Sequence, residues 1–338
     1  MIDDRPSTSP GPVLSIVVPA LDEEENLVPL FDELAPILDD LGLPWELLFV
    51  DDGSRDETWS RVLQLGERDP RVRGLRLSRN FGHQYALLAG ISRARGEAVV
   101  TMDADLQHPP RIVPQLVEEW RKGNRVVHTV RLHSQDESVF KRLTSRLFYS
   151  VFSFLSGSRL ESGMADFRLL DRQAADGLLA FREEGLFLRG IVQWMGFPSS
   201  KVEFEARPRH TGNTSYSLGR MIKLMWAGVS SFSLVPLRLA VVLGLLTSLF
   251  AIEQGFEAIY RKVILDVTVP GWTQTMVVLT FLFGVLFVLL GIIGEYIGRI
   301  LIEVRGRPRF LIEEEFGNGT GSTTTGGRWT VPSRPAKD

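Results

Sequence analysis

Residues 98–105 read Ala98-Val99-Val100-Thr101-Met102-Asp103-Ala104-Asp105, an apolar run that ends in two carboxylates spaced by one residue. The run has the length and composition of a buried strand. Open α/β sheets place their ligands at the carboxyl ends of such strands. Hard divalent cations prefer oxygen ligands and leave positions open for phosphate oxygens. The stretch therefore predicts a strand whose tip holds a cation against a diphosphate through Asp103 and Asp105.

The first half of the chain alternates short β-rich runs with helical patterns. This alternation is typical of βαβ units and of an α/β fold with a mostly parallel sheet. A stripe of Leu and Phe predicts a helix over 24–41, and Asp56 and Pro109 suit the first turns of two more. The predicted strands cover residues 14–19, 45–50, 72–77, 98–102 and 125–130.

Composition excludes several classes of protein. The 338 residues carry a formal net charge of −3, so no global basic field favours nucleic acid as the main partner. The absence of cysteine removes disulfides, thiol catalysis and zinc–thiolate sites. Residues 1–12 are polar and proline-rich, so we expect a disordered N-terminus and no cleavable signal peptide.

Two long apolar runs follow the soluble part. Residues 239–252 and 276–294 contain no charged side chain, and about 20 apolar residues span a bilayer. We expect a transmembrane hairpin over 233–300, with spans at about 234–253 and 275–297. Lys and Arg concentrate outside the hairpin, so the catalytic part and both termini are expected on the cytoplasmic side of the cell (inner) membrane. The segment 301–338 is expected to be a cytoplasmic tail, disordered from about residue 317.

Two further segments are amphipathic. Residues 137–155 have an apolar stripe and a basic side, which fits a core-facing helix or a helix on the membrane surface equally well. Residues 218–232 have the same pattern directly before the first span, and there the pattern favours an interfacial helix.

The order of the motifs gives a resemblance. Pro19-Ala20-Leu21-Asp22-Glu23 follows one predicted strand, Asp51-Asp52-Gly53-Ser54 the next, and Asp103-Ala104-Asp105-Leu106-Gln107 a third. With 163–170 and 209–217, this order resembles family 2 glycosyltransferases, which have the GT-A nucleotide-sugar fold, here over 13–217. The segments 231–238, 294–299 and 303–308 are similar to the branch of polyprenyl-phosphate glycosyltransferases with two spans, which includes dolichol-phosphate mannosyltransferase-like and bactoprenol glucosyltransferase-like enzymes.

The resemblance implies roles for particular positions. The nucleotide sugar would be bound by Pro19, Leu21, Glu23, Asp52, Asp103, Ala104, Asp105 and Arg209. The metal would be held by Asp103, Asp105 and Gln107, and the acceptor phosphate by Arg131, Lys141 and Ser145. The catalytic set is Asp103, Asp105, Asp166 and Arg209, with Asp166 acting as a base or orienting a cationic side chain. His83 and His108 are left out of this set.

Two positions depart from the family pattern. Leu21-Asp22 replaces the common Tyr-Asn, and Thr214-Ser215-Tyr216 replaces Ser-Lys-Tyr, so Arg209 would meet the diphosphate alone.

The implied activity is transfer of one sugar, with inversion, from a nucleotide sugar to a polyprenyl phosphate such as undecaprenyl phosphate. UDP-glucose is the favoured donor and GDP-mannose the next, with Mg²⁺ or Mn²⁺ as cofactor and a homo-oligomer as the assembly. One alternative is a processive polysaccharide synthase, although Gln193-Trp194 lacks the arginine of Gln-x-x-Arg-Trp. Another is a non-catalytic membrane scaffold that keeps the fold.

Overall fold

The computed structural model describes residues 11–132, 164–181, 188–205, 235–264 and 271–317. They form two compact units. The first contains the described residues up to 205 together with 307–317, and the second contains 235–264 and 271–306. The two predicted amphipathic helices lie outside the described residues, as do Lys141, Ser145 and Arg209.

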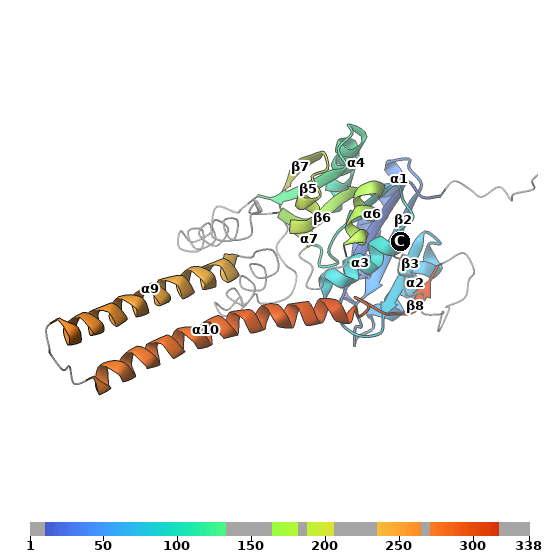
Figure 1. Ribbon diagram of the computed structural model, residues 1–338. Coiled ribbons are helices and arrows are strands. Elements are labelled where there is room, and N and C mark those ends of the chain that lie inside the picture. The colour runs from blue at the N-terminus through green and yellow to red at the C-terminus, as the bar shows by residue number, and fades with distance from the viewer. Residues whose placement is uncertain (1–10, 133–163, 182–187, 206–234, 265–270, 318–338) are drawn as a thin grey trace, which may run out of the picture. The chain divides into compact units, whose positions relative to one another are not determined.

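The first unit is built on an eight-stranded sheet in the order β7-β5-β6-β4-β1-β2-β3-β8 (Figure 1). The strands β1, β2, β3 and β4 pair in parallel, as do β5 and β7, whereas β6 and β8 run antiparallel to their neighbours. The predicted α/β fold with a mostly parallel sheet is therefore confirmed. The strands are β1 Leu14–Ala20, β2 Trp45–Asp51, β3 Val72–Leu77, β4 Ala98–Thr101, β5 Val126–Arg131, β6 Met164–Asp171, β7 Ser199–Phe204 and β8 Ile312–Phe316.

Helices cover both faces of this sheet. On one face, Leu27, Leu30 and Leu34 of α1 pack into a core that also receives apolar side chains of α2 and α4. On the other face α3 lies so close that a Cβ at Gly90 would overlap the Val17 side chain. The helices are α1 Leu27–Asp40, α2 Thr58–Arg68, α3 His83–Arg93, η1 Pro110–Ile112, α4 Val113–Arg121, α6 Arg172–Ala180 and α7 Leu188–Trp194.

The five predicted strands agree with β1 to β5 within one residue at each end. Their side chains are almost all buried, because helices cover both faces of the sheet. Parallel strands that are covered in this way have nearly continuous apolar sequences. Sequence analysis did not predict β6, β7 or β8.

The segment 301–338 was expected to be a cytoplasmic tail, but the structure shows that part of it forms the strand β8. This strand pairs with the edge strand β3. Glu315 accepts a hydrogen bond from buried Arg73 at 3.1 Å, and Glu314 accepts one from the Trp59 indole at 3.1 Å. Phe316 packs against the core. The segment 312–316 therefore belongs to the catalytic sheet.

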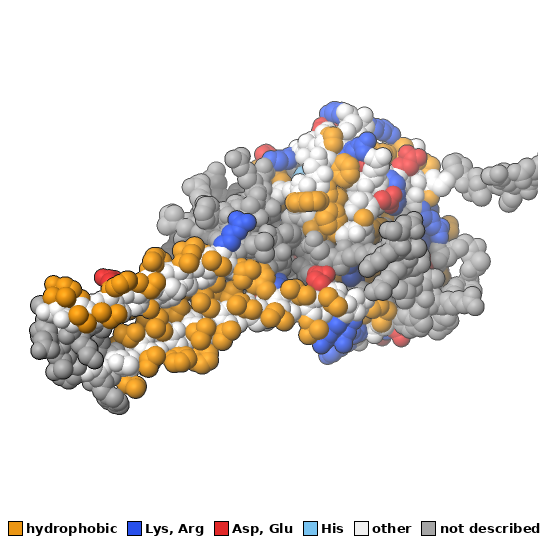
Figure 2. Space-filling model, viewed as in Figure 1, with side chains coloured by type: hydrophobic (Ala, Val, Ile, Leu, Met, Phe, Trp, Pro, Cys, Tyr) orange, Lys and Arg blue, Asp and Glu red, His pale blue; other side chains and the backbone are white. Residues whose placement is uncertain are grey.

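The second unit consists of two long apolar helices, α9 Val235–Val263 and α10 Trp272–Arg305. Residues 237–261 and 275–305 are long and apolar enough to cross a membrane, and their side chains are nearly all exposed within the unit. Figure 2 shows apolar side chains along both helices. The rings of Phe250 and Phe281 lie 6.2 Å apart where the helices meet. The described residues therefore contain two candidate membrane helices, as predicted, and both are longer than the predicted spans.

Candidate active site

The strand ends bring the predicted site residues to one edge of the sheet. Ala20 at the end of β1 is level with Asp51 at the end of β2. Thr101 of β4 pairs with Arg168 of the antiparallel β6. Asp103 and Asp166 each lie two residues beyond this pair toward the same edge, so the register places them close together.

The loops after β1 and β2 are joined by several hydrogen bonds. Ser54 Oγ accepts a bond from the Asp22 backbone N–H at 3.0 Å, and Asp22 in turn accepts one from the Arg55 N–H at 2.8 Å. The Glu23 N–H donates to the Thr58 hydroxyl at 2.9 Å. Asp22 has a positive φ of 54°, which an aspartate tolerates better than most residues. These hydrogen bonds fix the backbone conformation at Leu21 and Glu23.

Residues 19, 21 and 23 differ in their environments. Pro19 is buried within β1, whereas the Leu21 side chain is exposed at the strand exit. The Glu23 carboxylate accepts a hydrogen bond from the Asn26 side chain. Leu21 therefore has a surface available to a ligand, while Pro19 contributes through the shape of the backbone.

The Asp52 carboxylate holds the loop that precedes α3. Its two oxygens accept hydrogen bonds from the Phe81 and Gly82 N–H groups at 2.8 and 2.9 Å. Burial raises the pKa of Asp52, although these two hydrogen bonds oppose the rise. The next residue, Gly53, has a φ of +74°, and a Cβ there would lie 2.6 Å from the Arg79 carbonyl carbon. Asp52 therefore anchors one loop of the site, and a contact with the nucleotide base is a prediction.

The Asp103-Ala104-Asp105 motif has a defined local geometry. Asp105 accepts a hydrogen bond from the Gln107 N–H at 3.1 Å. The Asp103 N–H donates to Nδ1 of His108 at 3.0 Å. The His108 ring is buried and stacks on Phe167 with centroids 5.1 Å apart. Burial lowers the pKa of His108, which favours the neutral ring that this acceptor role requires.

Asp103 and Asp105 have the chemistry expected for a cation site. The Asp103 Oδ1 atom is buried and accepts no hydrogen bond, and an unsatisfied carboxylate oxygen of this kind suits a hard cation. Among the described residues, no cluster of three or more His, Cys, Asp or Glu side chains is placed to hold a metal ion. A cation held here would therefore take its remaining ligands from substrate and solvent.

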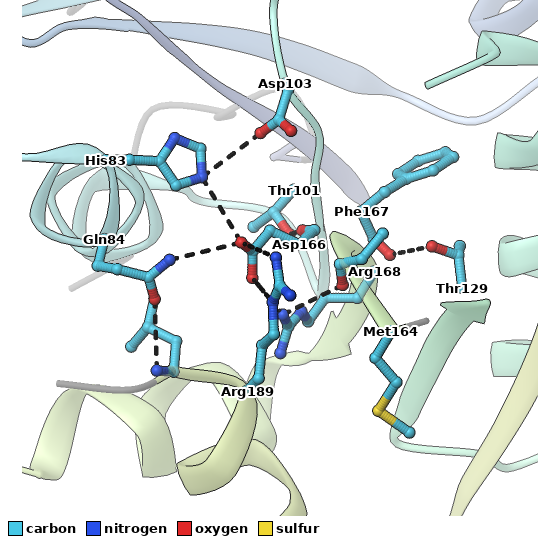
Figure 3. Close-up of polar contacts among 12 residues, drawn as sticks. His83, Gln84, Thr101, Asp103, Thr129, Met164, Asp166, Phe167, Arg168 and Arg189 are labelled. Carbon is cyan, nitrogen blue, oxygen red and sulfur yellow. Dashed lines mark hydrogen bonds and ion pairs between the residues drawn. The ribbon is translucent and has the colours of Figure 1, made fainter. Parts of the chain in front are cut away.

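Asp166 is the centre of a polar cluster (Figure 3). Its Oδ1 accepts hydrogen bonds from Arg168 at 2.6 Å and from Arg189 Nε at 3.0 Å, and its Oδ2 accepts one from Arg189 Nη2 at 2.8 Å. The Gln84 amide donates to Oδ2 at 3.4 Å. His83 Nε2 lies 3.8 Å from Asp166 Oδ2 and 3.4 Å from Asp103 Oδ1.

The charge state of Asp166 follows from these contacts. Burial alone would raise its pKa, but the hydrogen bond from Arg189 and the charges of Arg168 and Arg189 outweigh burial and hold the pKa well below its usual range. A carboxylate so strongly stabilised in its ionised form is a poor proton acceptor. The cluster therefore supports the orienting role for Asp166 over the role of a base.

His83 and His108, which were left out of the catalytic set, lie at this edge together with Gln84 and Arg189, which were not predicted from the sequence. Arg189 is a single arginine on α7 with no motif around it. Arg131, expected at the acceptor phosphate, ends β5 at the same edge and is level with Phe204 at the end of β7. Lys141, Ser145 and Arg209 fall outside the described residues.

Comparison with known proteins agrees with this fold. The profile of glycosyl transferase family 2 matches residues 15–179. The uncharacterized glycosyltransferase YkcC of Bacillus subtilis (strain 168) is 38% identical over 90% of this chain and 94% of its own length. A prophage bactoprenol glucosyl transferase homolog of Escherichia coli (strain K12) is 34% identical over 89% of this chain and 98% of its own.

A solved structure shares the fold. Glucosyl-3-phosphoglycerate synthase from Mycobacterium tuberculosis, crystallised with Mn²⁺, UDP and phosphoglyceric acid, aligns with a TM-score of 0.51 at 23% identity, covering 65% of this chain and 78% of that one. The chain belongs to glycosyl transferase family 2. It is a glycosyltransferase with a GT-A-like sheet and two candidate membrane helices.

Proposed function

We propose that this glycosyltransferase moves a single sugar from a nucleotide sugar to a polyprenyl phosphate at the cytoplasmic face of the membrane, with inversion at the anomeric carbon. The observation that carries the proposal is the cluster of Asp103, Asp105 and Asp166 at one edge of the sheet, in a chain with two candidate membrane helices. Relatives named bactoprenol glucosyl transferases, which match over nearly their whole length, support a lipid-phosphate acceptor.

The proposed donor is UDP-glucose, with GDP-mannose second. The names of the glucosyl transferase relatives favour glucose. On this proposal Pro19, Leu21, Glu23 and Asp52 surround the nucleoside. Asp103, Ala104, Asp105 and Arg209 face the diphosphate. The product would be a lipid-linked sugar for a cell-envelope glycan.

Attack on the donor needs no strong base in this protein. A phosphate monoester has a second pKa of about 6, so the acceptor oxygen is already largely ionised at neutral pH. The harder requirement is to bring that dianion close to the donor diphosphate, and cationic side chains meet this requirement. Arg131, Lys141 and Ser145 are proposed for the acceptor phosphate. Asp166 keeps a cationic partner in position instead of accepting a proton.

Asp103 and Asp105, with Gln107 next to them, are the residues that would hold a divalent cation. The buried Oδ1 of Asp103, which accepts no hydrogen bond, supports this assignment. The chemistry supplied by a bound Mg²⁺ or Mn²⁺ is neutralisation of the charge that develops on the departing nucleoside diphosphate.

The proposed topology places the GT-A unit and both termini in the cytoplasm, with the connection between α9 and α10 on the other side. The excess of Lys and Arg outside the hairpin supports it. A homo-oligomer is proposed as the assembly. Cysteine substitutions in this cysteine-free chain, labelled with an impermeant reagent in intact spheroplasts, test the topology: sites in 265–270 should react and sites in 318–338 should not.

The activity is tested with membranes that contain the protein, a divalent cation, a labelled UDP- or GDP-sugar and undecaprenyl phosphate. We expect one labelled lipid carrying one sugar. Products of increasing length would favour a processive polysaccharide synthase. A complete lack of transfer from all common donors, with Asp105→Asn leaving the cellular phenotype unchanged, would favour a non-catalytic scaffold.

A further inference from the structure

Arg189 is a cationic side chain at the site that the proposed reaction does not yet use. It lies near the start of α7, and its Nε and Nη2 atoms donate to the two oxygens of Asp166 at 3.0 and 2.8 Å. Two parallel hydrogen bonds of this kind fix the plane of a guanidinium group. The orientation of Arg189 is therefore set by Asp166.

Two arginine side chains contact Asp166. This one carboxylate is shared by Arg189 and Arg168, which donates to it at 2.6 Å. The Arg168 side chain, on β6, is only 4% exposed, whereas the Arg189 side chain is 38% exposed. Arg189 is therefore the one of the two arginines whose side chain a ligand can reach.

Gln84 fixes the backbone that carries Arg189. Its side-chain oxygen accepts a hydrogen bond from the Leu188 N–H at 3.3 Å, and its amide nitrogen donates to Asp166 at 3.4 Å. One side chain of α3 therefore holds both the start of α7 and the carboxylate that orients Arg189 (Figure 3). Such preorganisation reduces the entropy lost when a ligand binds.

The contacts of His83 show where Arg189 lies relative to the Asp103-Ala104-Asp105 motif. Its Nε2 atom lies 3.4 Å from Asp103 Oδ1 and 3.8 Å from Asp166 Oδ2. The His83 imidazole therefore lies between the Asp166–Arg189 pair and Asp103, one of the carboxylates proposed to hold the metal ion. A group bound at Arg189 would lie beside the donor diphosphate.

We propose that Arg189 binds the phosphate of the acceptor, and that Asp166 and Gln84 are positioning residues that hold it for this contact. The inference rests on the proposed function, in which the second anion that must approach the donor is the acceptor phosphate. Arginine suits this ligand, since its planar fork matches two phosphate oxygens. The same chemistry would suit a phosphate of the donor, so the test measures both substrates.

The kinetic test compares wild type, Arg189→Gln, Arg189→Lys and Gln84→Ala. Arg189→Gln should raise the KM for undecaprenyl phosphate by about tenfold or more, the usual effect of losing a charged hydrogen bond. The KM for the nucleotide sugar should change by less than about twofold on the same argument. Arg189→Lys should recover part of the loss because it keeps the charge, and Gln84→Ala should raise the same KM by a smaller factor. Arg121→Gln, on the exposed last turn of α4, is the matched control.

A binding test separates this inference from the proposed function. Full-length protein in detergent is titrated with undecaprenyl phosphate alone and with UDP alone, and the melting temperature of each variant reports folding. Arg189→Gln should weaken binding of the lipid and leave UDP binding intact.

Each outcome decides a separate point. Wild-type protein that binds the lipid through Arg189 but transfers no sugar would reject the function and keep the contact. Active enzyme with an unchanged acceptor KM, or with a raised donor KM only, would reject the contact and keep the function. Wild-type protein that neither binds the lipid nor transfers sugar would reject both.

Discussion

Nδ1 of His108 accepts a hydrogen bond from the backbone N–H of Asp103 at 3.0 Å, and this contact fixes the start of the acidic motif. His108→Asn places an amide oxygen where it can accept the same bond, whereas His108→Leu removes the acceptor and leaves a partly buried N–H without it. We expect kcat to fall at least about tenfold in His108→Leu, and clearly less in His108→Asn. Steady-state transfer assays on both variants check this. Equal losses in the two would show that ring packing against Phe167 matters more than the hydrogen bond.

Removal of divalent cations should abolish transfer. Under the proposed assignment, EDTA removes the cation held by Asp103 and Asp105, and added Mg²⁺ or Mn²⁺ should restore the rate. Asp105→Asn should lower kcat by about a hundredfold or more, the usual scale for losing charge stabilisation at a leaving group. Glu118→Gln, on the exposed face of α4, is a suitable control. Full activity in EDTA would contradict the cation site.

Docking of β8 is tested by a pair of substitutions. A Cβ at Gly66 would overlap the Phe316 ring, so Gly66→Ala should destabilise the protein by about 1–3 kcal/mol even though alanine favours the helix by about 1 kcal/mol. In a Phe316→Ala background the overlap disappears, and Gly66→Ala should become neutral or stabilising. Thermal unfolding of the two single variants and the double variant measures this coupling. Additive effects would show that Phe316 does not occupy this position.

The stability supplied by Asp166 should depend on pH in a defined direction. Its folded-state pKa lies well below the unfolded value of about 3.9. Its contribution is therefore complete at neutral pH and is lost as the pH falls below about 4 toward the folded-state pKa. Asp166→Asn leaves Arg168 buried without its charge partner and should cost about 3 kcal/mol at pH 7. Melting temperatures from pH 3 to 7 should show the gap between the two proteins narrowing below about pH 4, and a constant gap would contradict this assignment.

The strands could be predicted from the sequence where apolar residues make up nearly the whole strand. Residues 14–20 and 98–101 form strands buried on both faces, so the apolar run itself marks them. The strand β8 could not be recognised in this way, because Ile312–Phe316 contains three glutamates. Two of these carboxylates, Glu314 and Glu315, accept hydrogen bonds from Arg73, Arg76 and Trp59, which lie more than 230 residues earlier in the chain.

The site residues also divide into those that a local sequence pattern marks and those that only the fold brings together. Asp103 and Asp105 were predicted because a strand leads directly to them, and the fold brings them to the expected edge. Arg189 was not predicted, since its partner Asp166 lies 23 residues away and the two meet only when α7 packs beside β6. The order Asp103, His83, Asp166, Arg189 across the site is a product of tertiary structure.

The position of β8 in the chain has a consequence for biosynthesis. Translation proceeds from the N-terminus, so the ribosome makes β1 to β7 and then both long apolar helices before residues 312–316 exist. Until then the outer edge of β3 has no strand beside it, and an uncovered edge invites pairing with other chains. The sheet is therefore completed only after both apolar helices have been synthesised, and until then the nascent chain carries an uncovered edge at which it can misassemble.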